Sequence, residues 1–340
     1  MPNALSKRFW MVLLTSLIGV LAVIYISLTN GTFDITIVEV LQTLFRTNPV
    51  REYDVLIFEF RLPRIVIAAL VGLGLGIVGA VLQGITRNGL ADPGILGINA
   101  GAGAAVVIFM LIFQGQVSGN GWMSVMTMPL FGMVGGLMAA ILIYAFSWNN
   151  GTLDAQRLIL VGIAIGSGFG ALSLYVSLKM NPQDYEMATV WFLGSIWNAN
   201  WQFIVSILPW LIIFIPIILT KSHVLDLFQL GETKAKSLGV SVEKEKSILL
   251  ISSIGIVCAC VSVSGSIGFV GLISAHISRR LVGMYHKHIL PVCGVVGMFL
   301  VVLSDFIAKT VFSPVELPVG IVISIIGVPY FLYLLFKATY

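Results

Sequence analysis

Ile65-Val-Ile-Ala-Ala-Leu-Val-Gly-Leu-Gly-Leu-Gly-Ile-Val-Gly-Ala-Val-Leu82 is an unbroken apolar stretch, and a helix of this length nearly crosses the roughly 30 Å hydrocarbon core of a bilayer. Similar stretches recur at Val12–Leu28, Val125–Phe146, Ile248–Val263 and Ile289–Leu303, and the charged residues lie almost only between them. The pattern predicts a polytopic membrane protein whose work concerns moving something across lipid.

The composition excludes most soluble classes of protein. The 340 residues have a mean hydropathy of +1.02 and only 10% are charged, whereas soluble domains carry about 25%. Because lipid offers no hydrogen bonds to the backbone, the apolar stretches must be helices; a barrel would show short alternating strands instead. We therefore predict an all-α fold with a single transmembrane domain over residues 1–340, in which the first apolar run is retained as a span.

Hydropathy divides the chain into about ten predicted spans. The segment 268–283 is short and interrupted by glycine, as in a partial or broken helix, and short helices are also expected at 191–197 and 226–238. The predicted spans are 9–28, 64–84, 94–113, 125–146, 157–178, 201–219, 247–265, 268–283, 288–307 and 319–336.

Basic residues in the short loops favour one orientation by about two to one. One set of loops holds most of them, including Lys7 and Lys234, and the alternate set holds most of the acids, such as Glu52 and Asp184. This distribution predicts that the first set of loops is cytoplasmic, together with both termini.

Glycine recurs within the spans at a spacing that lets helices approach closely, so that van der Waals packing holds them together in lipid. Close packing explains most of these glycines, and a direct role in a pore is the alternative. The residues at this spacing are Gly72 and Gly76, Gly132 and Gly136, and Gly162, Gly166 and Gly170.

Missing motifs narrow the function. The sequence has no G-x-x-x-x-G-K-[ST] phosphate loop, no H-E-x-x-H and no G-x-S-x-G, so the chain does not hydrolyse ATP through a phosphate loop of its own. Its spans contain few ionisable residues, with Asp305 near an outer end and His276 near an inner one, whereas proton- or sodium-coupled transporters commonly embed such groups at mid-membrane. An ion-coupled secondary transporter is therefore a weaker alternative. A membrane enzyme or scaffold, which would need a polar catalytic cluster or a soluble domain, is another.

Three polar stretches interrupt the apolar pattern. In Arg61-Leu-Pro-Arg64, Pro63 fits the first turn of a helix, and the two arginines would surround the outer mouth of the second span or simply extend to the interface. In the stretch 83–101, turn-forming residues join two spans on the cytoplasmic side, where irregular backbone is tolerated only against protein or a water-filled cavity. We expect a cytoplasmic gate or pathway there, built from Gln83, Asn88, Asp92, Pro93 and Asn99.

The third stretch is Leu230-Gly-Glu-Thr-Lys-Ala-Lys-Ser-Leu-Gly239 in the largest cytoplasmic loop. It predicts a short amphipathic helix from Glu232 to Leu238, with Ala235 and Leu238 on one face and with Gly239 ending the helix in a left-handed conformation. The helix is either a solvated loop element or a helix seated in a groove of a cytoplasmic partner.

In their order and spacing, these segments resemble the FecCD/BtuC-like permease family, the membrane subunits of ABC importers for iron–siderophores, haem and cobalamin. The matching segments are 61–64, 83–101, Trp191-Phe-Leu-Gly-Ser195, 230–239, Gly268-Phe-Val-Gly-Leu272 with His276 and Arg279, Asp305, and Glu316-Leu-Pro-Val-Gly320.

The resemblance implies a BtuC-like permease of ten helices that pairs with a second permease, identical or paralogous, with two ATPase subunits and with an extracytoplasmic binding protein. Docking of that protein would involve Arg61, Arg64 and Lys309, although the family more often has arginine at the last position, which can form a two-pronged bond to a carboxylate. ATP and magnesium would bind the ATPase, and this chain would hold no cofactor. ATPase coupling would involve the segment at about 226–240, in particular Gly231, Glu232, Ala235, Leu238 and Gly239.

By the same resemblance, the chain would import a ferric siderophore across a bacterial cytoplasmic membrane, because most family members serve iron; cobalamin and haem are the alternatives. The sequence departs from the family at Gly89 and Ala275, where proline is usual. Both changes remove a rigid backbone angle. They either loosen the inner gate or mark one half of a pair of different permeases.

Overall fold

A computed structural model describes residues 2–31, 35–47, 50–113, 122–149, 151–313 and 315–338. Eight helices among these residues are long and apolar enough to cross a membrane, and Ile98–Phe113 is a shorter apolar helix. The segment expected to be broken forms a helix of 13 residues, Val270–Val282, which begins after an irregular stretch. The prediction of an all-α membrane protein is confirmed.

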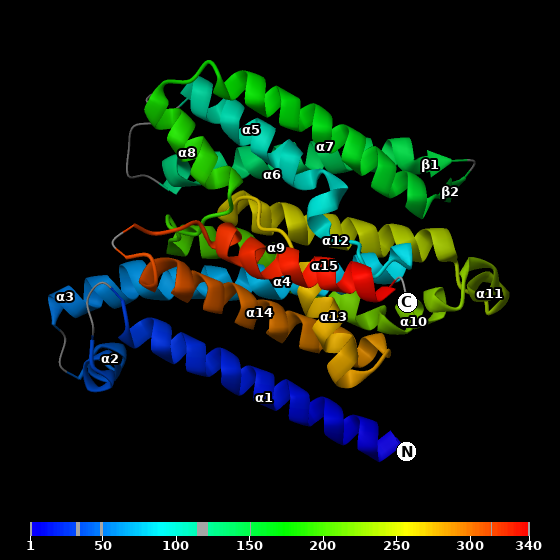
Figure 1. The fold of residues 1–340 in the computed structure, drawn as a ribbon, viewed down its shortest axis with the longest axis horizontal. Coiled ribbons are helices and arrows are strands. Elements are labelled where there is room, and N and C mark those ends of the chain that lie inside the picture. Colours follow the sequence, from blue (N-terminus) through cyan, green and yellow to red (C-terminus); the bar gives the residue numbers. More distant parts are fainter. Residues whose placement is uncertain are drawn as a thin grey trace.

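The elements follow one another along the chain and are labelled in Figure 1. The first half contains α1 (Pro2–Thr29), α2 (Ile37–Leu44), α3 (Arg51–Asp54), a π-helical stretch (Val55–Arg61), α4 (Leu62–Thr86), a 3₁₀ turn (Pro93–Leu96), α5 (Ile98–Phe113), α6 (Trp122–Ser147) and the antiparallel strands β1 (Trp148–Asn149) and β2 (Thr152–Leu153). The second half contains α7 (Ala155–Ser177), α8 (Pro182–Phe192), α9 (Trp201–Thr220), α10 (Ser222–Gln229), α11 (Glu232–Ser237), α12 (Val242–Ser264), α13 (Val270–Val282), α14 (His286–Thr310) and α15 (Val319–Ala338).

Every predicted span falls on one of these helices, but two smaller predictions need correction. The helix expected at 191–197 lies earlier, at Pro182–Phe192, and ends before Gly194, whose φ of 77° is left-handed. The helix expected at 226–238 is two helices, α10 and α11, because the chain turns at Gly231 with a φ of 97°. Without a Cβ, glycine adopts such angles at little cost.

The second span is longer than its apolar run suggests. Helical structure is continuous from Arg51 to Thr86, and Pro63 lies in the first turn of α4, as expected. The preceding turn widens into a π-helix, in which the Leu62 N–H donates to the Ile57 carbonyl. A π-turn of this kind commonly marks a functional region of a helix.

The centre of the molecule is the contact between α4 and α14. A Cβ on Gly72 would overlap the backbone of Gly297, and one on Gly76 would overlap the carbonyl of Cys293. The close-packing interpretation of this glycine pair is therefore confirmed. Gly170 in α7, by contrast, has open space where its Cβ would lie, so its spacing reflects no contact within the described chain.

The two ends of the bundle carry different elements (Figure 1). One end holds α10, α11, the hairpin β1–β2, the start of α1 and the finish of α15; we call it the inner end. The opposite end, with α2 and α3, is the outer end. The structure thus puts the start of the first helix and the finish of the last helix at the end that carries the predicted coupling segment.

Candidate functional site

Arg61 and Lys309, two of the three predicted docking cations, lie at the outer end and bond to α1. The guanidinium of Arg61 donates to the Leu28 carbonyl, and its residue is 7% exposed. The Lys309 ammonium on α14 donates to the Oγ of Ser27 at 2.7 Å and to its carbonyl at 3.1 Å. Both cations therefore satisfy the last turn of α1, whose final carbonyls lack helical partners.

Arg64, the third predicted docking residue, pairs with two carboxylates. Its Nε lies 2.8 Å from Oδ1 of Asp305 on α14, and a terminal nitrogen lies 2.7 Å from Oε2 of Glu316, which precedes α15. The Asp305 side chain is 1% exposed and that of Glu316 is 34% exposed. The structure thus gathers the predicted cations at one end, with each side chain already bonded within the chain.

The predicted gate residue Gln83 is buried at the inner end of α4. Its Nε2 donates to the Ala91 carbonyl at 3.2 Å, and its Oε1 accepts a bond from Arg279 of α13. Gln83 thereby joins the loop after α4 to α13.

Asp92 and Pro93 bring the same loop onto the first turn of α13. The Asp92 carboxylate accepts from the Gly94 N–H at 2.9 Å and from the Leu272 N–H at 3.2 Å. Pro93 packs against Gly271, where an added Cβ would lie 3.0 Å from the proline ring. Burial raises the pKa of the Asp92 carboxyl above its ordinary value, and the backbone donors oppose that rise. Asp92 therefore caps α13 from a distance.

The remaining gate candidates have different environments. Asn88 is exposed and its Oδ1 accepts from the Leu90 N–H at 3.0 Å, as in an ordinary turn. Asn99 is buried and its Nδ2 donates to the Ser266 hydroxyl at 3.0 Å, between α5 and the stretch before α13. The structure brings Gln83, Asp92, Pro93 and Asn99 against α13 or its approach, and leaves Asn88 outside this group.

The predicted coupling segment forms a compact projection at the inner end. Ala235 of α11 is fully buried, whereas Leu238 is 62% exposed and lies just after the helix. The expectation that these two residues share one face is therefore not met in burial: Ala235 packs inward, whereas Leu238, the residue after the last turn of α11, is left exposed. Gly239 has a φ of 84° and ends the segment as predicted.

Sequence reasoning missed the residues that hold this projection in place. Lys246 of α12 lies 2.7 Å from Glu232, the first residue of α11, and His286 of α14 lies 2.7 Å from Asp226 of α10. The sequence offered one signal, because Lys246 lies close to glutamates where the apolar run of α12 begins. That signal did not reveal which carboxylate would pair with the lysine.

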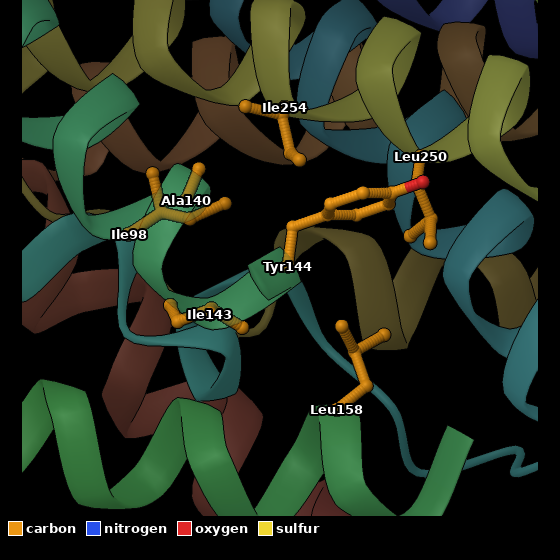
Figure 2. Close-up of a pocket in the computed structure, with 7 residues that line it drawn as sticks. All are labelled: Ile98, Ala140, Ile143, Tyr144, Leu158, Leu250 and Ile254. Atoms are coloured by element: carbon orange, nitrogen blue, oxygen red, sulfur yellow. The ribbon is translucent and has the colours of Figure 1, made fainter. Parts of the chain in front are cut away.

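Figure 2 shows a small hollow between α5, α6, α7 and α12 that is not a ligand site. Its volume is about 10 Å³ and its lining is apolar, apart from a tyrosine hydroxyl that bonds to Ser247 at 2.8 Å. A space of this size holds at most one water, and it offers few polar partners. Over the described residues, no cluster of three or more His, Cys, Asp or Glu side chains suits a metal ion. The lining residues are Ile98, Ala140, Ile143, Tyr144, Leu158, Leu250 and Ile254.

Comparisons with known proteins give this arrangement its context. The iron-uptake system permease protein FeuC of Bacillus subtilis is 59% identical over 94% of this chain and 95% of its own length. The iron(3+)-hydroxamate import system permease protein FhuG of the same organism is 45% identical over 94% of each chain. A solved metal-chelate type ABC transporter in an inward-facing conformation superimposes with a TM-score of 0.81 at 28% identity, covering 97% of this chain and 99% of its own. The FecCD transport family matches residues 19–337, and the chain belongs to that family.

Proposed function

We propose that this chain is the membrane-spanning permease subunit of an ABC importer that carries a ferric siderophore across the bacterial cytoplasmic membrane. The names of the relatives support iron as the cargo, since FeuC serves iron uptake and FhuG serves iron(3+)-hydroxamate import. A hemin transport permease of Yersinia pestis is also similar, at 35% identity, so haem is the alternative cargo, followed by cobalamin.

The observation that carries the proposal is the projection formed by α10 and α11. It stands at the end of the molecule where α1 begins and α15 finishes (Figure 1). It exposes two large apolar side chains, Leu230 at 52% and Leu238 at 62%, beside a fully buried Ala235. Exposed leucines on a segment that is fixed to the rest of the chain are typical of side chains that become buried in the groove of a partner protein. We propose that a set of residues in this segment either contacts the ATPase or shapes the surface that does so. These residues are Gly231, Glu232, Ala235, Leu238 and Gly239.

The distribution of buried charge supports a driving force outside this chain. Buried side chains of Asp, Glu, Lys, Arg and His in the described ranges lie in the outer or inner turns of the long helices or in the loop after α4, and none lies in the middle of an apolar helix. Relays for protons or sodium use such groups inside spans. ATP hydrolysis would therefore occur on two partner ATPase subunits, with ATP and magnesium bound there. These buried residues are Arg61, Asp92, Lys246, His286 and Asp305.

The outer cations remain our proposed docking residues for an extracytoplasmic binding protein. Because Arg64 is already bonded to two carboxylates, a carboxylate of the binding protein would replace the partly exposed Glu316, while Asp305 stays in place. Arg61 and Lys309 would support that surface by fixing the end of α1.

For the inner gate, we propose that Gln83, Asp92, Pro93 and Asn99 move together with α13, and that Asn88 shapes the exposed turn. In this proposal the inner end, with both termini, faces the cytoplasm. A second permease, identical or paralogous, completes the pathway.

Reconstitution tests the proposal directly. The complex of two permeases and two ATPases is placed in liposomes, and binding protein loaded with ferric siderophore, haem or cobalamin is added. We expect uptake of the ferric siderophore that requires ATP and persists when proton and sodium gradients are collapsed. Uptake by the permease alone on an ion gradient would contradict the proposal, and stimulation only by haem or cobalamin would change the cargo.

A further inference from the structure

Lys246 is a buried cation in the second turn of α12, only 1% exposed. Removing an ammonium from water is costly unless the group finds charged or hydrogen-bonding partners. A lysine in this position therefore needs a structural or functional reason, and its neighbours supply one.

The ammonium joins two segments that are distant in the sequence. It donates to Oε1 of Glu232 at 2.7 Å and to the Leu153 carbonyl at 3.2 Å. Glu232 is the first residue of α11, and Leu153 ends β2. One side chain thus connects the proposed coupling helix with the hairpin that leads into α7.

A second bond fixes the same hairpin residue from the other side. The Leu153 N–H donates to Oε2 of Glu243, one turn before Lys246 on α12, at 3.0 Å. Both backbone polar groups of Leu153 are therefore held by α12. The next residue, Asp154, accepts from the Gln156 and Arg157 N–H groups at 2.8 Å and 3.2 Å and so caps α7. Any shift of Leu153 is carried directly into the first turn of α7.

The helix at the far side of this link leaves much of its surface uncovered by the rest of the chain. Only 17% of the apolar window of α7 is buried within this chain, against 78% for the long helix that contains α4 and for α12. Because α7 contacts the chain mainly along one side, it can shift together with its neighbours at a smaller cost in packing than a helix buried on all sides, and the well-buried α12 supports the link.

We propose that Lys246 is a positioning residue that transmits displacement of α11 to α7 during the ATPase cycle. This inference rests on the proposed function. When an ATPase partner moves α11, the pair between Glu232 and Lys246 moves Leu153 and the cap of α7. The permease pathway thereby responds to closure of the ATPase.

The test compares substitutions on one helix in the reconstituted complex. Lys246→Met keeps the length of the side chain and removes its charge, Lys246→Arg keeps the charge, and Lys244→Met is the matched control because Lys244 is exposed on the same turn. The readout is the amount of cargo transported per ATP hydrolysed. We expect Lys246→Met to lower this ratio roughly tenfold, which is within the range of measured couplings between sites. We expect Lys246→Arg to restore much of it and Lys244→Met to leave it unchanged.

A distance measurement separates transmission from simple stabilisation. Spin labels are placed at Ser237, the last residue of α11, or at Gln156 in the first turn of α7, both exposed. Distances to the same label on the second permease are followed as ATP is added. In the unsubstituted complex both labels should move. With Lys246→Met, we expect the label at Ser237 to move and the label at Gln156 to stay in place.

Each outcome decides between the two proposals. An unsubstituted complex without ATP-driven uptake overturns the proposed function and this inference together. The inference alone is overturned if the unsubstituted complex is coupled and Lys246→Met transports as much cargo per ATP. It is also overturned if Lys246→Met lowers the thermal stability of the complex and leaves the amount of cargo per ATP unchanged. If Lys246→Met does not assemble, Glu232→Gln removes the partner's charge but keeps an acceptor. A reduced ratio in that variant supports the link, and an unchanged ratio overturns it.

Discussion

A cation with little exposed surface holds the outer end of the α4–α14 pair and another holds the approach to the inner end of α7, but the two cations act in different surroundings. Arg64 closes a contact in which glycines let two backbones touch, and its main partner Asp305 is 1% exposed. Lys246 bonds to the Leu153 carbonyl just before α7, a helix whose apolar window is only 17% buried within this chain, and to Glu232 of α11, which is 36% exposed. A charged side chain therefore fastens two closely packed helices in one place and links α12 to a largely uncovered helix in the other.

The sharpest test of this contrast is Asp305→Ala. It would leave Arg64 buried with only Glu316, and breaking a buried pair from one side costs about 3–5 kcal/mol. We expect a large fall in the free energy of unfolding, measured in detergent by thermal or denaturant unfolding. A loss below about 1 kcal/mol, the level of an exposed pair, would mean that the outer cluster does not fasten the core.

The glycine contacts provide the second test. Gly72→Ala places a methyl group against the Gly297 backbone, and overpacking of this kind costs about 1–3 kcal/mol. Gly170→Ala is the matched control, because open space surrounds that position and alanine favours a helix by about 1 kcal/mol. Unfolding experiments should therefore give changes of opposite sign, and equal losses at both sites would remove the distinction between the packed glycine contact of α4 and the open position on α7.

Glu316→Gln should have a smaller effect. The carboxylate is 34% exposed, and ion pairs at such sites contribute about 1 kcal/mol or less. Because Asp305 still satisfies Arg64, we expect a slight loss of stability. Binding-protein docking, measured by titration at low salt, should become tighter because Arg64 has lost a competing internal carboxylate. Weaker docking would indicate that Glu316 itself contacts the binding protein.

Leu238→Ser should change the stability least. The side chain is 62% exposed, and substitutions at such positions usually fall within about 0.5 kcal/mol. We nevertheless expect weaker binding of the ATPase subunit, measured by co-purification at graded concentrations, because an apolar anchor is lost. Normal ATPase binding would mean that the projection meets its partner through other residues.

Much of the fold and part of the site could be predicted before the structure. Apolar length located each span, and the order of the polar stretches identified the family. The predicted ends were less accurate where backbone conformation decides, as at Gly231, which divides one predicted helix into two. The exposure of Leu238 was also missed, because it depends on which neighbouring elements cover α11 and not on the helical spacing alone.

The sequence by itself determined that the chain is a bundle of membrane helices, because the transfer of apolar residues into lipid and the pairing of backbone groups within a helix are local properties of each segment. Only the tertiary structure decided which charges meet: Arg64 pairs with Asp305, 241 positions away, and Lys246 bonds to Leu153, 93 positions away. Those partners depend on which helices become neighbours and how each is rotated. Apolar length leaves that choice open, and close contacts such as Gly72 against Gly297 settle it.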